Sequence, residues 1–157
     1  MNGRFLGDWR EGDVLESLVF PVTSTAIVAS ALATRDYSPL HHDDRYVREQ
    51  AGLPGILLNS PAIQALVGRY LGERFGTLAR PGRLRIALQA AVHAGVSLSL
   101  TGRITGLAID ARGVGWADVA VELRDAERCC VQVSARLAIP VDAHDDPWLR
   151  TGEDWQP

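Results

Sequence analysis

The stretch NSPAIQALVGRYLGERFG, residues 59–76, carries the strongest structural pattern in the chain. Asn59 and Ser60 are residue types that cap helix N-termini, and Pro61 suits the first turn of a helix. The apolar residues that follow recur at helical spacing: Ile63, Leu66, Val67, Tyr70, Leu71 and Phe75. The stretch therefore predicts a central helix with one broad apolar face, which needs a sheet to cover it.

A second face of the same predicted helix carries small residues, namely Gln64, Gly68, Gly72 and Gly76, each four residues after the one before. A glycine inside a helix costs about 1 kcal/mol relative to alanine. We therefore expect another part of the structure to approach this face closely and offset the cost. Packing is the favoured explanation, although space left beside the glycines would also suit a ligand.

The sequence after Pro81-Gly82 changes to the alternation of β-strands. Alternating runs cover residues 84–92, 96–104, 117–123 and 129–139, with short turns at 111–113 and 125–127. Helices followed by strands indicate the α+β class, and short turns indicate an antiparallel meander. This outline resembles the hotdog fold, an antiparallel β-sheet wrapped around a central α-helix, and we expect five or more strands.

The region before the central helix contains a long polar loop. A capped run at residues 23–32 predicts a short helix that ends near Asp36, because Pro39 disfavours helical backbone just before it. Residues 37–55 are rich in turn formers around one short helical turn, residues 43–51. Long loops of this kind often carry functional residues.

Composition excludes several classes of function. The chain has 157 residues, which fits one domain, and a net charge of −3 gives no support for nucleic-acid binding. All 16 basic residues are arginine, which excludes Schiff-base lysines, the P-loop lysine and serine–lysine hydrolases. Neighbouring Cys129 and Cys130 point to opposite faces of a strand, so we expect two free thiols.

We expect a domain at residues 1–140 and an acidic C-terminal tail at residues 141–157. Residues 1–13 lack the apolar core of a signal peptide, and no apolar run is long enough to span a bilayer. A cytoplasmic protein is the expectation.

The segment Asp36-Tyr37-Ser38-Pro39-Leu40-His41 places a carboxyl group and an imidazole on either side of a turn stiffened by proline. Such a turn can bring both side chains to one point. Adding water to a double bond conjugated to a thioester needs a base, an acid and a donor to the enolate oxygen. Asp36 and His41 can supply the first two, and N–H groups at the start of a buried helix can supply the third.

This segment resembles the Asp-x-Asn-Pro-x-His motif of MaoC-like dehydratases and R-specific enoyl-CoA hydratases. Five more segments lie in family-like order: residues 12–13, 20–23, 52–55, 81–82 and 101–103. The resemblance implies a hotdog-fold enoyl-CoA hydratase or 3-hydroxyacyl-CoA dehydratase in which Asp36 and His41 jointly hold the attacking water. It implies no cofactor beyond the coenzyme A of the substrate.

The chain departs from the family pattern in two places. Ser38 stands where the family usually has asparagine, and Asn59-Ser60-Pro61 stands where it usually has His-Gly-Met. Because Pro61 has no N–H, the resemblance implies the Ser60 N–H as the donor to the thioester oxygen. Both departures are similar to MaoC-type subunits of bacterial steroid side-chain degradation, which hydrate bulky enoyl-CoA thioesters and are often heteromeric.

The remaining candidates contact substrate rather than perform chemistry. We expect Ser38 and Asn59 to bind substrate, and Arg83, Arg85 and Arg103 to meet coenzyme A phosphates, although arginines on exposed strands are common. Consecutive side chains diverge, so residues 41–44 are not expected to hold a metal. Asp43 is expected to cap the helical turn that follows it.

Three other functions stay open. The chain could be a dehydratase acting on acyl carrier protein, or a hotdog thioesterase, although Gln64 and Glu73 are then the only candidates for the thioesterase carboxylate on the central helix. It could also be a non-catalytic partner subunit, against which the retained Asp36 and His41 argue. Because sheet edges are usually buried by pairing, we expect a homodimer, with a heterodimer as the alternative.

Overall fold

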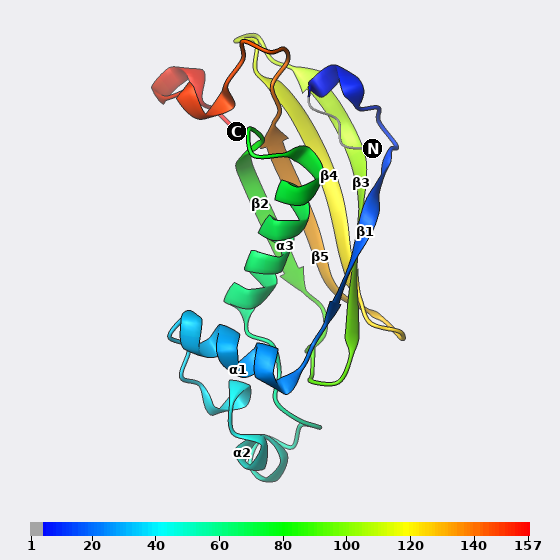
Figure 1. Ribbon diagram of the computed structural model, residues 1–157, viewed down its shortest axis with the longest axis vertical. Coiled ribbons are helices and arrows are strands. Elements are labelled where there is room, and N and C mark those ends of the chain that lie inside the picture. The colour runs from blue at the N-terminus through cyan, green and yellow to red at the C-terminus, as the bar shows by residue number, and fades with distance from the viewer. Residues whose placement is uncertain (1–4) are drawn as a thin grey trace.

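The computed structural model describes residues 5–157, so residues 1–4 of the expected domain lie outside the described part (Figure 1). Five strands and three α-helices make up the fold. In chain order they are β1 (Val14–Pro21), α1 (Ser24–Ala33), α2 (Asp44–Glu49), α3 (Ser60–Phe75), β2 (Arg80–Leu88), β3 (Ser97–Ile109), β4 (Gly115–Arg124) and β5 (Cys129–Ala138).

The strands form one antiparallel sheet in the order β1-β3-β4-β5-β2. The prediction of at least five antiparallel strands is confirmed, but the prediction of one continuous four-stranded meander was wrong. Only β3, β4 and β5 follow one another, whereas β2 pairs with β5 at the far edge. Alternation identifies a strand without identifying its neighbour, which is set by the path of the connecting segment.

One strand was missed from the sequence, and another ends earlier than expected. β1 was not predicted, because its alternation is interrupted by a register shift between Leu15 and Leu18. β2 ends at Leu88 instead of Val92, since the backbone N–H groups of residues 89 and 90 both turn to the carbonyl of Cys130. The segment after β2 thereby leaves the sheet and meets the approach to α3, where Leu58 N–H donates to Val92 O.

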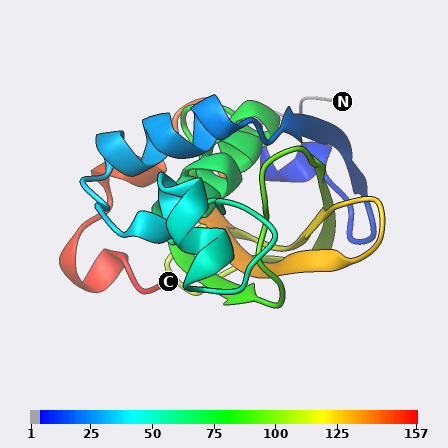
Figure 2. The same ribbon diagram turned by 90° about the horizontal axis from the view of Figure 1, so that it is seen from below.

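The apolar face of α3 packs against one face of the sheet, as predicted (Figures 1 and 2). Val67 and Tyr70 are fully buried. Gly102 on β3 lies directly under the Tyr70 ring, where an added Cβ would come within 3.1 Å of the ring and its hydroxyl. A side chain at position 102 would therefore push α3 away from the sheet.

The glycine face of α3 is not covered within the described chain, so the expectation of close approach was wrong for a single copy. A Cβ added at Gly68 or Gly72 would meet nothing within 4 Å, and both residues are exposed. Gly76 has a separate reason, since it ends the helix at φ 84°, a conformation that favours glycine.

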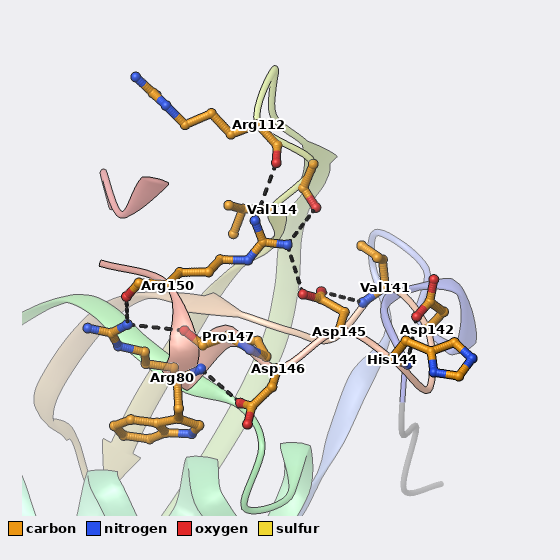
Figure 3. A network of polar contacts seen from close by, with 12 residues as sticks. Arg80, Arg112, Val114, Val141, Asp142, His144, Asp145, Asp146, Pro147 and Arg150 are labelled. Carbon is orange, nitrogen blue, oxygen red and sulfur yellow. Dashed lines mark hydrogen bonds and ion pairs between the residues drawn. The ribbon is translucent and has the colours of Figure 1, made fainter. Parts of the chain in front are cut away.

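Residues 141–157 pack onto the start of β2 at the end of the sheet opposite α1 and α2 (Figures 1 and 3). The Arg80 guanidinium donates to the carbonyls of Pro147 and Arg150 and lies 3.6 Å from the centre of the Trp155 ring. Arg150 in turn donates to Asp145 at 2.8 Å. Cys130 and Cys129 are free thiols, as expected.

Gly102 and Gly68 form a matched pair of test positions. Gly102→Ala places a Cβ 3.0 Å from the buried Leu15 side chain and 3.1 Å from Tyr70. We expect the free energy of unfolding to fall by about 1–3 kcal/mol in this variant, the usual cost of overpacking. We expect it to rise by about 0.5–1 kcal/mol in Gly68→Ala, because a glycine in an uncrowded helix is replaced. Denaturant titration measures both.

A Gly102→Ala protein as stable as its parent would contradict the packing of α3 on β3. A destabilised Gly68→Ala protein would show instead that a surface outside the single chain covers that face of α3.

Candidate active site

The loop that carries Asp36 and His41 begins with a sharp reversal of the chain at the end of α1. Arg35 adopts φ 53°, the left-handed region, which costs a non-glycine residue on the order of 1–2 kcal/mol. The reversal lets Asp36 N–H donate back to Ala31 O at 2.9 Å. Residues Pro39–His41 then form one 3-10 turn, in which His41 is buried. Together these turns bring Asp36 and His41 to the same point.

The orientation of His41 follows from its backbone partner. Its Nδ1 lies 2.7 Å from the carbonyl oxygen of Leu57, and because a carbonyl only accepts, Nδ1 donates. The other ring nitrogen, Nε2, lies 3.2 Å from Asp36 Oδ2. The side chains of His41 and Asp36 are 10% and 30% exposed, so the pair borders solvent without being immersed in it. The backbone contact of Nδ1 thus leaves Nε2 facing the Asp36 carboxylate.

Asp36 is held as a carboxylate by hydrogen bonds. Asn59 Nδ2 donates to its Oδ2 at 3.2 Å, and Ser38 N–H donates to its Oδ1 at 3.3 Å. The Asn59 bond is the main cause that lowers the pKa of Asp36 below its ordinary value, against partial burial, with further lowering from Ser38 N–H and His41. Asp36 is therefore ionised at neutral pH.

The start of α3 lies on the same cavity as this pair and includes one N–H group without a partner among the described residues. Asn59 caps the helix, with its Oδ1 accepting from Ala62 N–H at 3.2 Å, and Ile63 N–H donates to Asn59 O. Pro61 has no N–H. Among the described residues, Ser60 N–H has no hydrogen-bond partner, and it lies at the positive end of the helix dipole.

These groups border a cavity of about 420 Å³. Asp36, His41 and Ser60 lie along it, as does Leu88, which is 54% exposed at the end of β2. The rest of the lining is mostly apolar: Leu57, Leu58, Asn59, Pro61, Ile63, Gln89, Ala90, Ala91 and Val92. An apolar pocket with a few convergent polar groups is typical of a site for a small molecule or acyl group.

The three arginines are not among the residues that line this cavity. Arg83 donates to Pro157 O at 2.7 Å, and Arg103 donates to Gly12 O at 2.6 Å. Arg85 lies on the exposed surface of β2 beside a separate hollow of the sheet. Their assignment to coenzyme A phosphates stays a prediction.

The smaller polar candidates also have defined places. Ser38 contributes its backbone N–H to Asp36, and Asp43 caps α2 by accepting from Tyr46 N–H, as expected. Asn59 is only 1% exposed, and its carboxamide is bonded to protein groups. In the part of the chain that the structure describes, no group of three or more His, Cys, Asp or Glu could hold a metal.

Sequence reasoning missed two parts of the site. One is Leu57, whose contribution is a carbonyl oxygen and so leaves no trace in residue type. The other is His93, whose Nδ1 lies 2.7 Å from Gly55 O. This contact holds the segment that carries Leu57. A histidine at the end of an alternating run was the one available signal.

No helix among residues 5–157 is both long enough and apolar enough to cross a membrane.

Comparison with known proteins gives structural likeness only. No family model and no curated protein sequence matches the chain. Among solved structures, the ChsH1-ChsH2 complex from Mycobacterium tuberculosis matches with 28% identity and a TM-score of 0.76, over 83% of this chain and 98% of that chain.

Two further matches carry activities in their names. The (R)-hydratase from A. caviae involved in PHA biosynthesis has 17% identity and a TM-score of 0.75, over 84% of this chain and 98% of that chain. The MaoC-like dehydratase from Rhodospirillum rubrum has 18% identity and a TM-score of 0.76, over 87% of this chain and 97% of that chain. Like these proteins, the chain has the hotdog fold, with the sheet wrapped around α3, and it is similar in structure to MaoC-like dehydratases and R-hydratases.

Proposed function

We propose that this chain is a hydro-lyase that reversibly adds water to a 2-enoyl-CoA thioester. The observation that carries the proposal is the contact of His41 Nε2 with Asp36 Oδ2 at 3.2 Å, on a cavity that Ser60 also lines. The Ser60 N–H has no hydrogen-bond partner among the described residues. One cavity thus holds a base, a carboxylate and a donor for a developing oxyanion. These are the groups that hydration of a conjugated thioester requires.

The mechanism uses the three groups in turn. Ser60 N–H donates to the thioester oxygen and draws electron density from the double bond. A water molecule bound between Asp36 and His41 gives a proton to Nε2 as its oxygen bonds to C3. The electron pair of the double bond moves to C2 and the thioester oxygen, and C2 then takes the proton back from His41. Asp36 orients the water and stabilises the protonated imidazole.

The substrate class is a further part of the proposal. The motif departures at Ser38 and at residues 59–61 resemble steroid side-chain-degrading subunits, and the cavity wall beyond β2 carries the small residues Ala90 and Ala91. Both features favour a bulky acyl group over a short chain. Coenzyme A phosphates would then meet exposed arginines, with Arg83, Arg85 and Arg103 as candidates.

A second candidate function is that of one subunit in a heteromeric MaoC-type hydratase. The observation in its favour is that two of the similar solved structures are complexes, ChsH1-ChsH2 and the HadBC 3R-hydroxyacyl-ACP dehydratase. Because the second complex is named as a dehydratase of an acyl group on acyl carrier protein, that carrier stays an alternative to coenzyme A for this chain. The intact contact between Asp36 and His41 argues against a purely non-catalytic subunit.

We also propose that the chain pairs through β2. This strand is one edge of the sheet, and it carries Leu84 and Leu88, which are 42% and 54% exposed. An unpaired edge with exposed apolar residues favours association with another sheet. A second copy is the proposed partner, and Leu88 would place that copy beside the cavity.

The direct test of the function is hydration by the purified chain alone. We expect it to hydrate both crotonyl-CoA and a steroid enoyl-CoA, with a higher kcat/KM for the steroid thioester. Rates should be unchanged after dialysis against EDTA, because acid–base groups carry the chemistry. Activity on neither thioester would refute the hydratase assignment, and a preference for crotonyl-CoA would refute the bulky substrate.

The catalytic pair is tested by substitution. We expect Asp36→Asn and His41→Ala each to lower kcat by at least ~10²-fold with circular dichroism unchanged, the size expected of a general acid–base group. His42→Ala is the matched control, since His42 is the exposed neighbour on the same loop and should keep its activity. Normal kcat in either pair variant would remove that residue from the mechanism.

The assembly is tested on the two edge strands. Leu84→Asp on β2 should shift a dimer towards monomer, because a two-fold axis would bring two buried charges together. Val19→Asp on β1 is the control, since Val19 is 61% exposed on the other edge. Light scattering after gel filtration reports the mass. A monomeric parent, or a dimer lost only through β1, would contradict the proposed pairing.

A further inference from the structure

One carboxamide, that of Asn59, joins the three parts of the site. Its Nδ2 donates to Thr34 Oγ1 at 2.8 Å and to Asp36 Oδ2 at 3.2 Å. Its Oδ1 accepts from Ala62 N–H at 3.2 Å and from Ser30 Oγ at 3.4 Å. The residue is 1% exposed, so these contacts are shielded from solvent. They link the end of α1, the loop that carries Asp36 and His41, and the first turn of α3.

We propose that Asn59 is a positioning residue: its buried carboxamide holds the Asp36 carboxylate beside His41 and ties it to the helix start that presents Ser60 N–H. This role rests on the proposed hydration and differs from the substrate contact that the sequence suggested. Through it the carboxylate and the oxyanion donor keep one relative geometry.

The chemistry of the contacts explains why this position needs an asparagine. A cap for α3 requires an acceptor, which serine, threonine or aspartate would also supply. The bond to Asp36 requires a donor as well, on a second atom of the same short side chain, because Oδ1 accepts from Ala62 N–H while Nδ2 donates to Asp36. A serine or threonine hydroxyl can donate and accept, but its single oxygen cannot occupy the positions of both Oδ1 and Nδ2. Aspartate at position 59 would still cap the helix, but it would turn a second carboxylate towards Asp36.

The charge state of Asp36 follows from the same contact. His41 is the titratable side chain that faces Asp36, Ser38 offers only its N–H, and Arg35 is exposed. The opposite wall, residues 88–92, carries no charged side chain. The Asn59 bond is the largest cause of the lowered pKa of Asp36, and partial burial opposes it. Without the bond, that pKa should rise and protonated Asp36 should persist to higher pH.

The test separates this role from capping by substitutions that keep the cap. In Asn59→Asp and Asn59→Ser a side-chain oxygen still accepts from the helix, but no N–H donor remains at the position from which Nδ2 reaches Asp36. We expect kcat to fall about 10- to 100-fold through misplacement of the pair. The acid limb of the kcat profile should move to higher pH, further in Asn59→Asp, where two carboxylates share a proton.

The matched control is Thr23→Ala, which removes the cap of α1, where Thr23 accepts from Ala26 N–H at 3.0 Å. We expect it to lower Tm by roughly 2–4 °C, as cap removal does in a chain of this size. Its pH profile should stay that of the parent.

Titration of Asp36 by carbon NMR of the labelled carboxyl group gives a readout that needs no activity, with Asp36→Asn assigning the signal. A parent protein that hydrates no enoyl thioester would refute the proposed function, and the titration would still decide the role of Asn59. A pKa of Asp36 that stays at the parent value in both position-59 variants would overturn the inference. If Asn59→Asp does not fold, Asn59→Ser alone decides it.

Discussion

The apolar face of α3 is buried against the sheet, and the position of the helix start follows from that contact. Tyr70 seats the helix on Gly102, where there is no room for a side chain. Because a helix is rigid over this length, its first turn then lies at a defined place beside the end of β2. The Ser60 N–H, which we propose as the oxyanion donor, is therefore carried by a stable element and can act without reorganisation.

His41, the proposed base, is held by a different part of the backbone. His41 donates to Leu57 O, and the segment that carries Leu57 is paired with both neighbours, through Leu57 N–H to Leu40 O and Leu58 N–H to Val92 O. His93 adds a bond to Gly55 O in the same segment. The imidazole is thus hydrogen-bonded to the backbone of Leu57, in a segment that pairs with the chain after β2. The carboxylate is hydrogen-bonded to Asn59, the N-cap of α3. The two supports meet at the 3.2 Å contact between His41 and Asp36.

Sequence predicted the parts of this structure that depend on periodicity and on residue chemistry. The helical spacing of residues 63–75 and the capping chemistry at Asn59 and Pro61 placed α3 within a residue of its observed start. The Asp36–His41 pair was predicted from the proline-stiffened turn and from a family resemblance, and the structure brings these side chains together. Both depend on short-range chemistry that one segment of sequence contains.

What sequence did not predict depends on contacts between distant segments. The place of β2 beside β5 is set by the path of residues 89–96, which no alternation encodes. The uncovered Gly68 and Gly72 show that a stripe of small residues does not reveal which element, if any, packs against it.

The most direct test of the proposed mechanism is hydration in deuterated water, with NMR of the product. Because Asp36 and His41 contact each other and so act from one side of the substrate, we expect one deuterium at C2, on the same face as the new 3-hydroxyl. A product with the deuterium and the hydroxyl on opposite faces would refute the shared role of the pair.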